Sequence, residues 1–126
     1  VAEELNLPFV YVRSSPKDHG LENLIEGDLK KGQKVVVIED LISTGGSSLK
    51  AVAALRNAGA EVLGMVAIFT YGFPVAAQKF DEAGVELTTL SNYNAALEHL
   101  LAMEQIGADE IETLKKWREA PEVWGV

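Results

Sequence analysis

The fold is decided by Val35-Val36-Val37-Ile38-Glu39-Asp40-Leu41-Ile42-Ser43-Thr44-Gly45-Gly46-Ser47-Ser48. A continuous apolar run comes first, and such a run is typical of a strand that is covered on both faces of a parallel sheet. Two acidic residues follow, then a short loop rich in glycine and hydroxyl side chains, then an expected helix. Because ligands of open α/β sheets bind beyond the carboxyl ends of the strands, this junction is the candidate site.

Further strands and helices alternate along the chain. Apolar runs predict strands at residues 9–12, 34–38 and 85–88 and within 61–69, and helices are expected at 47–57, 74–80, 92–104 and 109–118. This alternation indicates an open, mostly parallel α/β sheet flanked by helices, which is a Rossmann-like arrangement. Residues 14–31 are polar and interrupted by proline and glycine, so they are expected to form a long functional loop.

Length and composition exclude several classes of protein. The chain has 126 residues, which suits a single domain over residues 1–126, and its formal net charge is −8. It contains no cysteine, which excludes a disulfide scaffold, a thiolate metal site and a cysteine nucleophile. The acidic balance argues against binding to nucleic acid, and no apolar run approaches the roughly 18 residues of a membrane span. A cytoplasmic location is therefore expected.

The loop after the two acids suits a phosphate monoester. Its glycines let backbone N–H groups approach an anion, and the helix start adds unpaired N–H groups and a positive dipole end. Four hydroxyl side chains can donate further hydrogen bonds: Ser43, Thr44, Ser47 and Ser48. Glu39 and Asp40 would repel a phosphate, but they can accept hydrogen bonds from the hydroxyls of a ribose. The acids and the loop together indicate a ribose 5-phosphate site.

The residues alone leave other interpretations open. A strand-to-helix turn with glycine and serine is often only a turn, with Ser47 as a helix cap, and an acidic pair at a strand end can bind a metal ion. The lysine that follows the glycines of a nucleotide-binding P-loop is absent, because Ser47 follows Gly46. A plain α/β nucleotide-binding module therefore stays an alternative.

Three segments resemble one enzyme family. Residues Glu39 to Ser48 resemble the phosphoribosyl-pyrophosphate (PRPP) motif of the type I phosphoribosyltransferases, and the wider stretch is similar to the orotate phosphoribosyltransferases. The segment Arg13…Lys17-Asp18-His19-Gly20 resembles the mobile catalytic loop of that family. Ala67 to Gly72 and the ending Trp117-Arg118…Trp124 are similar to bacterial members, with both tryptophans expected to be packing anchors. The resemblance covers essentially the whole chain.

The resemblance implies a reaction and its partners. Ribose 5-phosphate would be transferred from PRPP to orotate, giving orotidine 5′-monophosphate and pyrophosphate in pyrimidine biosynthesis. Mg²⁺ is implied as the cofactor, bound mainly through the pyrophosphate of PRPP rather than by protein ligands. The implied assembly is a homodimer in which loop 14–31 crosses to the partner's site, with no nucleic acid and no membrane as partner.

The resemblance also assigns roles to positions of this sequence. Lys17, His19 and Asp40 are implied to be catalytic. The substrate-binding set comprises loop cations, ribose acids and the 5′-phosphate loop: Arg13, Lys17, His19, Glu39, Asp40, Leu41, Ile42, Ser43, Thr44, Gly45, Gly46 and Ser47. Ser14 and Ser15 stand where the family usually has a second loop lysine, so one cationic contact to pyrophosphate is expected to be missing.

Members of this family carry a further portion of chain before the position of Val1. The resemblance therefore implies that this chain is the C-terminal part of a longer enzyme and lacks the N-terminal hood. Such a part is expected to keep the ribose 5-phosphate site but to be inactive alone. A missing edge of the sheet is expected to expose apolar surface and to favour self-association. Two other functions stay open: a type I phosphoribosyltransferase that acts on a purine or uracil, and a non-catalytic regulatory domain that keeps the PRPP motif.

Overall fold

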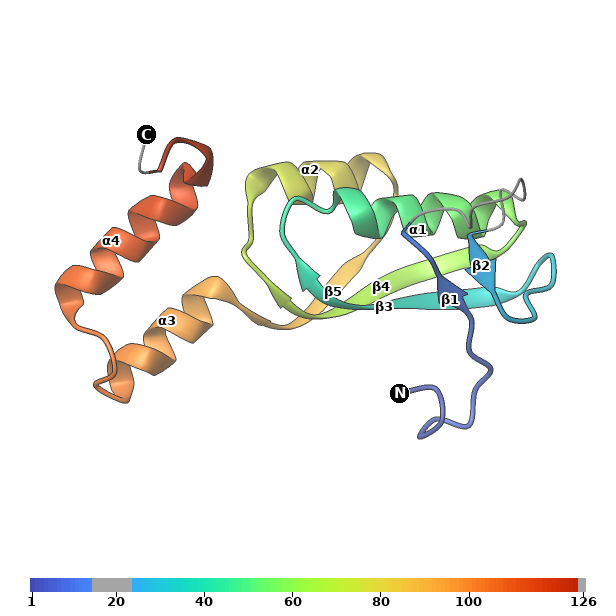
Figure 1. Cartoon of the computed structure of the whole chain (residues 1–126), viewed down its shortest axis with the longest axis horizontal. Coiled ribbons are helices and arrows are strands. Elements are labelled where there is room, and N and C mark those ends of the chain that lie inside the picture. Colours follow the sequence, from blue (N-terminus) through green and yellow to red (C-terminus); the bar gives the residue numbers. More distant parts are fainter. Residues whose placement is uncertain (15–23, 125–126) are drawn as a thin grey trace.

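The main sheet consists of three parallel strands with two helices on one face. A computed structural model of the chain describes residues 1–14 and 24–124. The strands β3 (Lys34–Ile42), β4 (Glu61–Thr70) and β5 (Leu87–Asn92) pair in the order β3-β4-β5. Helix α1 (Gly46–Asn57) connects β3 to β4, helix α2 (Pro74–Glu82) connects β4 to β5, and both helices cover the same face (Figure 1). The predicted parallel α/β sheet with flanking helices is confirmed.

Two smaller parts flank this sheet. The short strands β1 (Tyr11–Val12) and β2 (Ile25–Glu26) form an antiparallel pair beside it. At the other end, helices α3 (Tyr93–Ala102) and α4 (Ala108–Glu119) and a 3₁₀ turn (Pro121–Val123) form an arm that extends away from the sheet (Figure 1). Among the described helices, none is both long enough and apolar enough to cross a membrane.

The core lies between the sheet and helices α1 and α2. Ile42 of β3 and Met65 of β4 pack with Val52 of α1 and Phe80 of α2, and all four are almost completely buried. The end of α1 is tied to the end of α2, because the Arg56 guanidinium donates to the carbonyl oxygens of residues 83 and 84 at 2.7 and 3.3 Å. This packing fixes where α1 begins, and α1 begins at the candidate site.

Several predicted bounds differ from the structure. β3 runs on to Ile42 because its last residues pair with β4, so the two acids lie inside the strand rather than after it. The last strand spans Leu87–Asn92 rather than 85–88, because the Val85 N–H donates to the Phe80 carbonyl and closes the end of α2. Two residues of the expected loop 14–31, Ile25 and Glu26, form strand β2.

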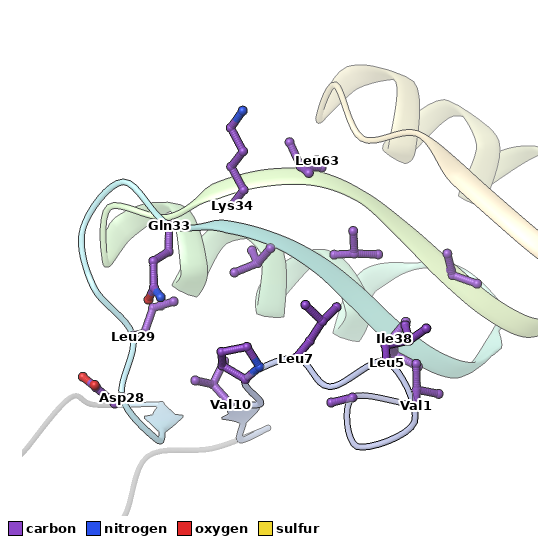
Figure 2. A pocket seen from close by; sticks show the side chains of 15 residues that line it. Val1, Leu5, Leu7, Val10, Asp28, Leu29, Gln33, Lys34, Ile38 and Leu63 are labelled. Atoms are coloured by element: carbon purple, nitrogen blue, oxygen red, sulfur yellow. The ribbon is translucent and has the colours of Figure 1, made fainter.

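The second face of the sheet carries an apolar cavity. Side chains alternate along β3, so Val37 packs toward the helices while Val36 and Ile38 point the other way and are 50% and 51% exposed. Residues 1–10 run along this second face and leave a cavity of about 600 Å³ lined mainly by aliphatic side chains (Figure 2). Because this second face of β3 is only half covered, the prediction of a strand covered on both faces is wrong, and the predicted exposure of apolar surface is confirmed. Within the described residues β3 is also an edge strand.

Candidate functional site

The candidate site lies where β3 ends and α1 begins. The carbonyl oxygen of Ile42 accepts from the Tyr71 N–H at 3.1 Å and from the Thr70 hydroxyl at 3.2 Å, so the end of β3 is anchored to the end of β4. The Ile42 side chain has no exposed surface. The side chain of Ile42 therefore belongs to the core, and the predicted binding role of this position is left to its backbone.

The glycine loop leaves the first turn of α1 open to an anion. Gly45 is the N-cap with φ of +76°, and it offers no side chain to cap the helix. No acidic residue lies in the first turn of α1. The unpaired N–H groups and the positive dipole end therefore remain available to a negatively charged group.

The two glycines of the loop have different structural requirements. A Cβ atom at Gly45 would lie 2.8 Å from Cε2 of the buried Phe80 ring, and the positive φ independently favours glycine there. A Cβ atom at Gly46 would meet no atom within 4 Å. Gly45 is thus required by the fold. Gly46 borders open space beside the helix start, and a turn with no ligand-binding role would not need a glycine at this position.

Glu39 and Asp40 are held in two different ways. The Glu39 carboxylate is half-buried, and its Oε2 accepts from the Ser48 hydroxyl of α1 at 2.8 Å while its Oε1 accepts from the Asp40 N–H at 3.2 Å. The Asp40 carboxylate is exposed, and its Oδ1 accepts from the adjacent Leu41 N–H at 2.7 Å. The structure therefore brings the predicted acids and the predicted phosphate loop together through Glu39 and α1.

The remaining predicted residues fall into four groups. Four of them are exposed around the loop: Leu41, Ser43, Thr44 and Ser47. Ser48 was expected to donate to a phosphate, but it is buried and its hydroxyl donates to Glu39, so that expectation is wrong. Arg13 follows β1 and forms an ion pair with Glu26 of β2 at 2.9 Å. Lys17 and His19, with Ser15 and most of the expected catalytic loop, lie outside the described residues.

An aromatic cluster lies beside the site, at the carboxyl ends of β4 and β5. Tyr71 stacks on Phe73 with ring centroids 5.4 Å apart, and Trp117 of α4 contacts Tyr71, Phe73 and Tyr93 at centroid distances of 5.6, 6.1 and 5.5 Å. The Tyr93 hydroxyl donates to the Leu114 carbonyl at 3.2 Å. Burial raises the pKa of Tyr93, and the neighbouring Tyr71 raises it further. The cluster joins the C-terminal arm to the sheet.

The prediction of packing anchors holds for one tryptophan. Trp117 is part of the aromatic cluster, whereas Trp124 is 49% exposed. Arg118, next to Trp117, donates to the Gly72 carbonyl at 3.0 Å and so adds a polar tie between α4 and the end of β4. The sequence does not reveal this cluster, because its members come from three separate segments, the loop after β4, α3 and α4, and share no local pattern.

The metal-binding capacity of the described residues is small. Nowhere in the parts of the chain that the structure describes do three aspartate, glutamate or histidine side chains converge on one point. Mg²⁺ is usually bound by one or two carboxylates together with phosphate oxygens of a substrate. The pair Glu39 and Asp40 fits an ion that arrives with a phosphorylated ligand, and it does not form a cage of its own.

The family of this chain is shown by its similarity to known proteins. The profile described as "Phosphoribosyl transferase domain" matches residues 1–99, which include β1 to β5, the glycine loop and both acids. This chain belongs to the phosphoribosyltransferase family. The parallel sheet with its flanking helices is therefore that of a phosphoribosyltransferase domain.

Curated relatives and solved structures agree with the family. This phosphoribosyltransferase is 63% identical over 126 residues to the orotate phosphoribosyltransferase of Porphyromonas gingivalis, covering 100% of this chain and 60% of the relative. Its fold matches the crystal structure of orotate phosphoribosyltransferase from Aeropyrum pernix with a TM-score of 0.70 and 34% identity, over 79% of this chain and 55% of that one. It also matches Mycobacterium tuberculosis orotate phosphoribosyltransferase in complex with PRPP, with a TM-score of 0.51 and 34% identity over 56% and 43% of the two chains. The chain spans about three fifths of the length of the curated relatives it matches.

Proposed function

We propose that this phosphoribosyltransferase acts in the transfer of ribose 5-phosphate from PRPP to orotate, giving orotidine 5′-monophosphate and pyrophosphate. One observation carries the proposal: two acids at the end of β3 adjoin an open helix N-terminus at the start of α1, and the Ser48–Glu39 hydrogen bond links them. The identity of 63% to a protein named orotate phosphoribosyltransferase supports orotate as the base.

In the proposed site, one kind of group binds the phosphate of the ligand and another kind binds its ribose. The first turn of α1 and the loop hydroxyls would receive the 5′-phosphate, where N–H donors and the helix dipole favour negative charge. The carboxylates of Glu39 and Asp40 would accept hydrogen bonds from the ribose hydroxyls. A carboxylate has about four acceptor positions, so both acids keep capacity for a ligand beside the bonds they already accept.

The same arrangement suits the chemistry of the transfer. Displacement at the anomeric carbon passes through an oxocarbenium-like state, in which the sugar gains positive charge and the departing pyrophosphate gains negative charge. Glu39 and Asp40 would stabilise the charge on the sugar. Arg13, Lys17 and His19 are proposed to stabilise the charge on pyrophosphate, with Lys17, His19 and Asp40 as the catalytic residues.

The cofactor and the assembly belong to the proposal as well. Mg²⁺ would bind together with PRPP, near Glu39 and Asp40. When bound, it would supply Lewis-acid stabilisation of the leaving pyrophosphate. A loop that closes over the site would exclude water from the reactive sugar. We propose that residues 14–31 provide this loop across a homodimer and that the enzyme takes part in pyrimidine biosynthesis in the cytoplasm.

The activity is tested by measuring pyrophosphate release from PRPP by the full-length protein. Release should require orotate, and adenine, guanine or uracil should not replace it. The variant Asp40→Asn should lower the rate at least about tenfold, since it removes a charge beside the cationic transition state. Asp81→Asn, which changes an exposed acid on α2, is the matched control and should leave the rate unchanged.

Two results would contradict the proposal. Release that depends on a purine or on uracil would identify another phosphoribosyltransferase. Absence of release together with undiminished PRPP binding would favour a regulatory domain. The 126-residue chain assayed alone is expected to bind PRPP without turnover, and robust turnover would disprove that expectation.

A further inference from the structure

Ser48 occupies an unusual place in the site. Among the described residues it is the one polar side chain that is buried, at 2% exposure. It lies in the first turn of α1, but its hydroxyl points toward β3 and donates to Glu39 Oε2 at 2.8 Å. Ser48 is buried and Glu39 is half-buried, so separating them is costly, because the Ser48 hydroxyl would lose its partner without regaining water.

The Ser48 bond completes the fixation of Glu39. One carboxylate oxygen takes the Ser48 hydroxyl and the other takes the Asp40 N–H at 3.2 Å. Two contacts on two oxygens fix the plane of the carboxylate and leave each oxygen with acceptor capacity for a ligand. Asp40 lacks such an anchor in the described structure, since its one hydrogen bond is to the adjacent backbone at 2.7 Å.

We infer that Ser48 is a positioning residue, which holds the Glu39 carboxylate at a fixed place relative to the N-terminus of α1. By doing so, Ser48 makes the site selective for a phosphorylated sugar with free hydroxyls. The inference rests on the proposed function. Because the same helix turn provides the N–H groups for a phosphate and the anchor for Glu39, the two ends of the ligand are matched through one rigid element. Ser48 itself does not touch the ligand.

The test compares two ligands that share a phosphate. Ribose 5-phosphate has the hydroxyls that Glu39 would receive, whereas ethyl phosphate has none. Dissociation constants are measured by NMR titration of the full-length protein and of Ser48→Ala, a change that removes one oxygen without adding bulk. Thr113→Ala is the control, because it removes a hydroxyl that donates to the Asp109 carbonyl on the remote helix α4.

Ser48→Ala should weaken ribose 5-phosphate about tenfold, which corresponds to losing about one ligand hydrogen bond to a Glu39 carboxylate that is no longer held in place, and should leave ethyl phosphate unchanged. Thr113→Ala should change neither constant. Equal weakening of both ligands would show that Ser48 only supports the helix, and no weakening of either would show that Glu39 does not need it. Either result overturns the inference.

A double-mutant cycle provides a second and independent readout. If Ser48 acts through Glu39, then Ser48→Ala should cost no further affinity for ribose 5-phosphate in a Glu39→Gln background. Additive losses would contradict the inference. Failure of the proposed function gives a different result, because the unaltered protein would then bind ribose 5-phosphate no better than ethyl phosphate.

Discussion

Replacing Gly45 by alanine should destabilise the protein far more than the same change at its neighbour Gly46. At Gly45 the backbone has φ of +76°, where alanine costs about 1–2 kcal/mol. The added Cβ would also lie 2.8 Å from Cε2 of Phe80, whose ring is 4% exposed and cannot move away freely. Overpacking of this kind costs about 1–3 kcal/mol, so the total is about 2–5 kcal/mol.

For a chain of 126 residues this loss corresponds to a fall in Tm of about 8–20 °C. Gly46→Ala meets no atom within 4 Å and should shift Tm by no more than about 2 °C, while weakening phosphate binding by filling the open space beside α1. Differential scanning calorimetry measures both values. Equal Tm values for the two variants would refute the distinction between a glycine required by the fold and one that borders the ligand.

Two further predictions concern the surface and the pH dependence of stability. The double variant Val36→Thr and Ile38→Thr should reduce self-association of the 126-residue chain, because both side chains are half-exposed on the second face of β3. Light scattering would then show an average mass nearer to the 13.6 kDa of one chain. An average mass equal to that of the unaltered chain would contradict the prediction. Burial raises the pKa of Tyr93 above its ordinary value of 10.0, so the folded state holds the phenol proton more tightly than the unfolded state does. This contribution is fully present below about pH 10 and is lost as the pH rises through the folded-state pKa. Urea unfolding across that range should show a steeper loss for the unaltered protein than for Tyr93→Phe, and identical slopes would disprove the assignment.

Much of the fold could be predicted because its signals are local. The apolar run of β3, the glycine loop and the periodicity of α1 each depend on a few adjacent residues. The bounds that were missed depend on distant partners: β3 reaches Ile42 because β4 continues beside it, and Val85 closes α2 instead of starting β5. The half-exposed face of β3 could not be read from the apolar run itself, since such a run has the same composition whether one or both faces are covered; the family resemblance alone predicted exposed apolar surface.

The site could be predicted by residue type but not by contact. The acids and the loop follow from their spacing and from the family resemblance. The role of Ser48 could not be read in this way, because Ser47 and Ser48 are adjacent serines that differ only in which side of α1 they occupy. The aromatic cluster around Trp117 depends on how α4 folds back, which no local pattern specifies.

The central claim is that the start of α1 binds the phosphate of PRPP while Glu39 and Asp40 bind its sugar hydroxyls. Titration calorimetry of the full-length protein with PRPP, compared with the double variant Glu39→Gln and Asp40→Asn, tests it most directly, with Glu61→Gln and Asp81→Asn as the control pair of exposed acids. We predict that the double variant binds PRPP at least about thirtyfold more weakly and ethyl phosphate equally well. Unchanged affinity for PRPP would contradict the account.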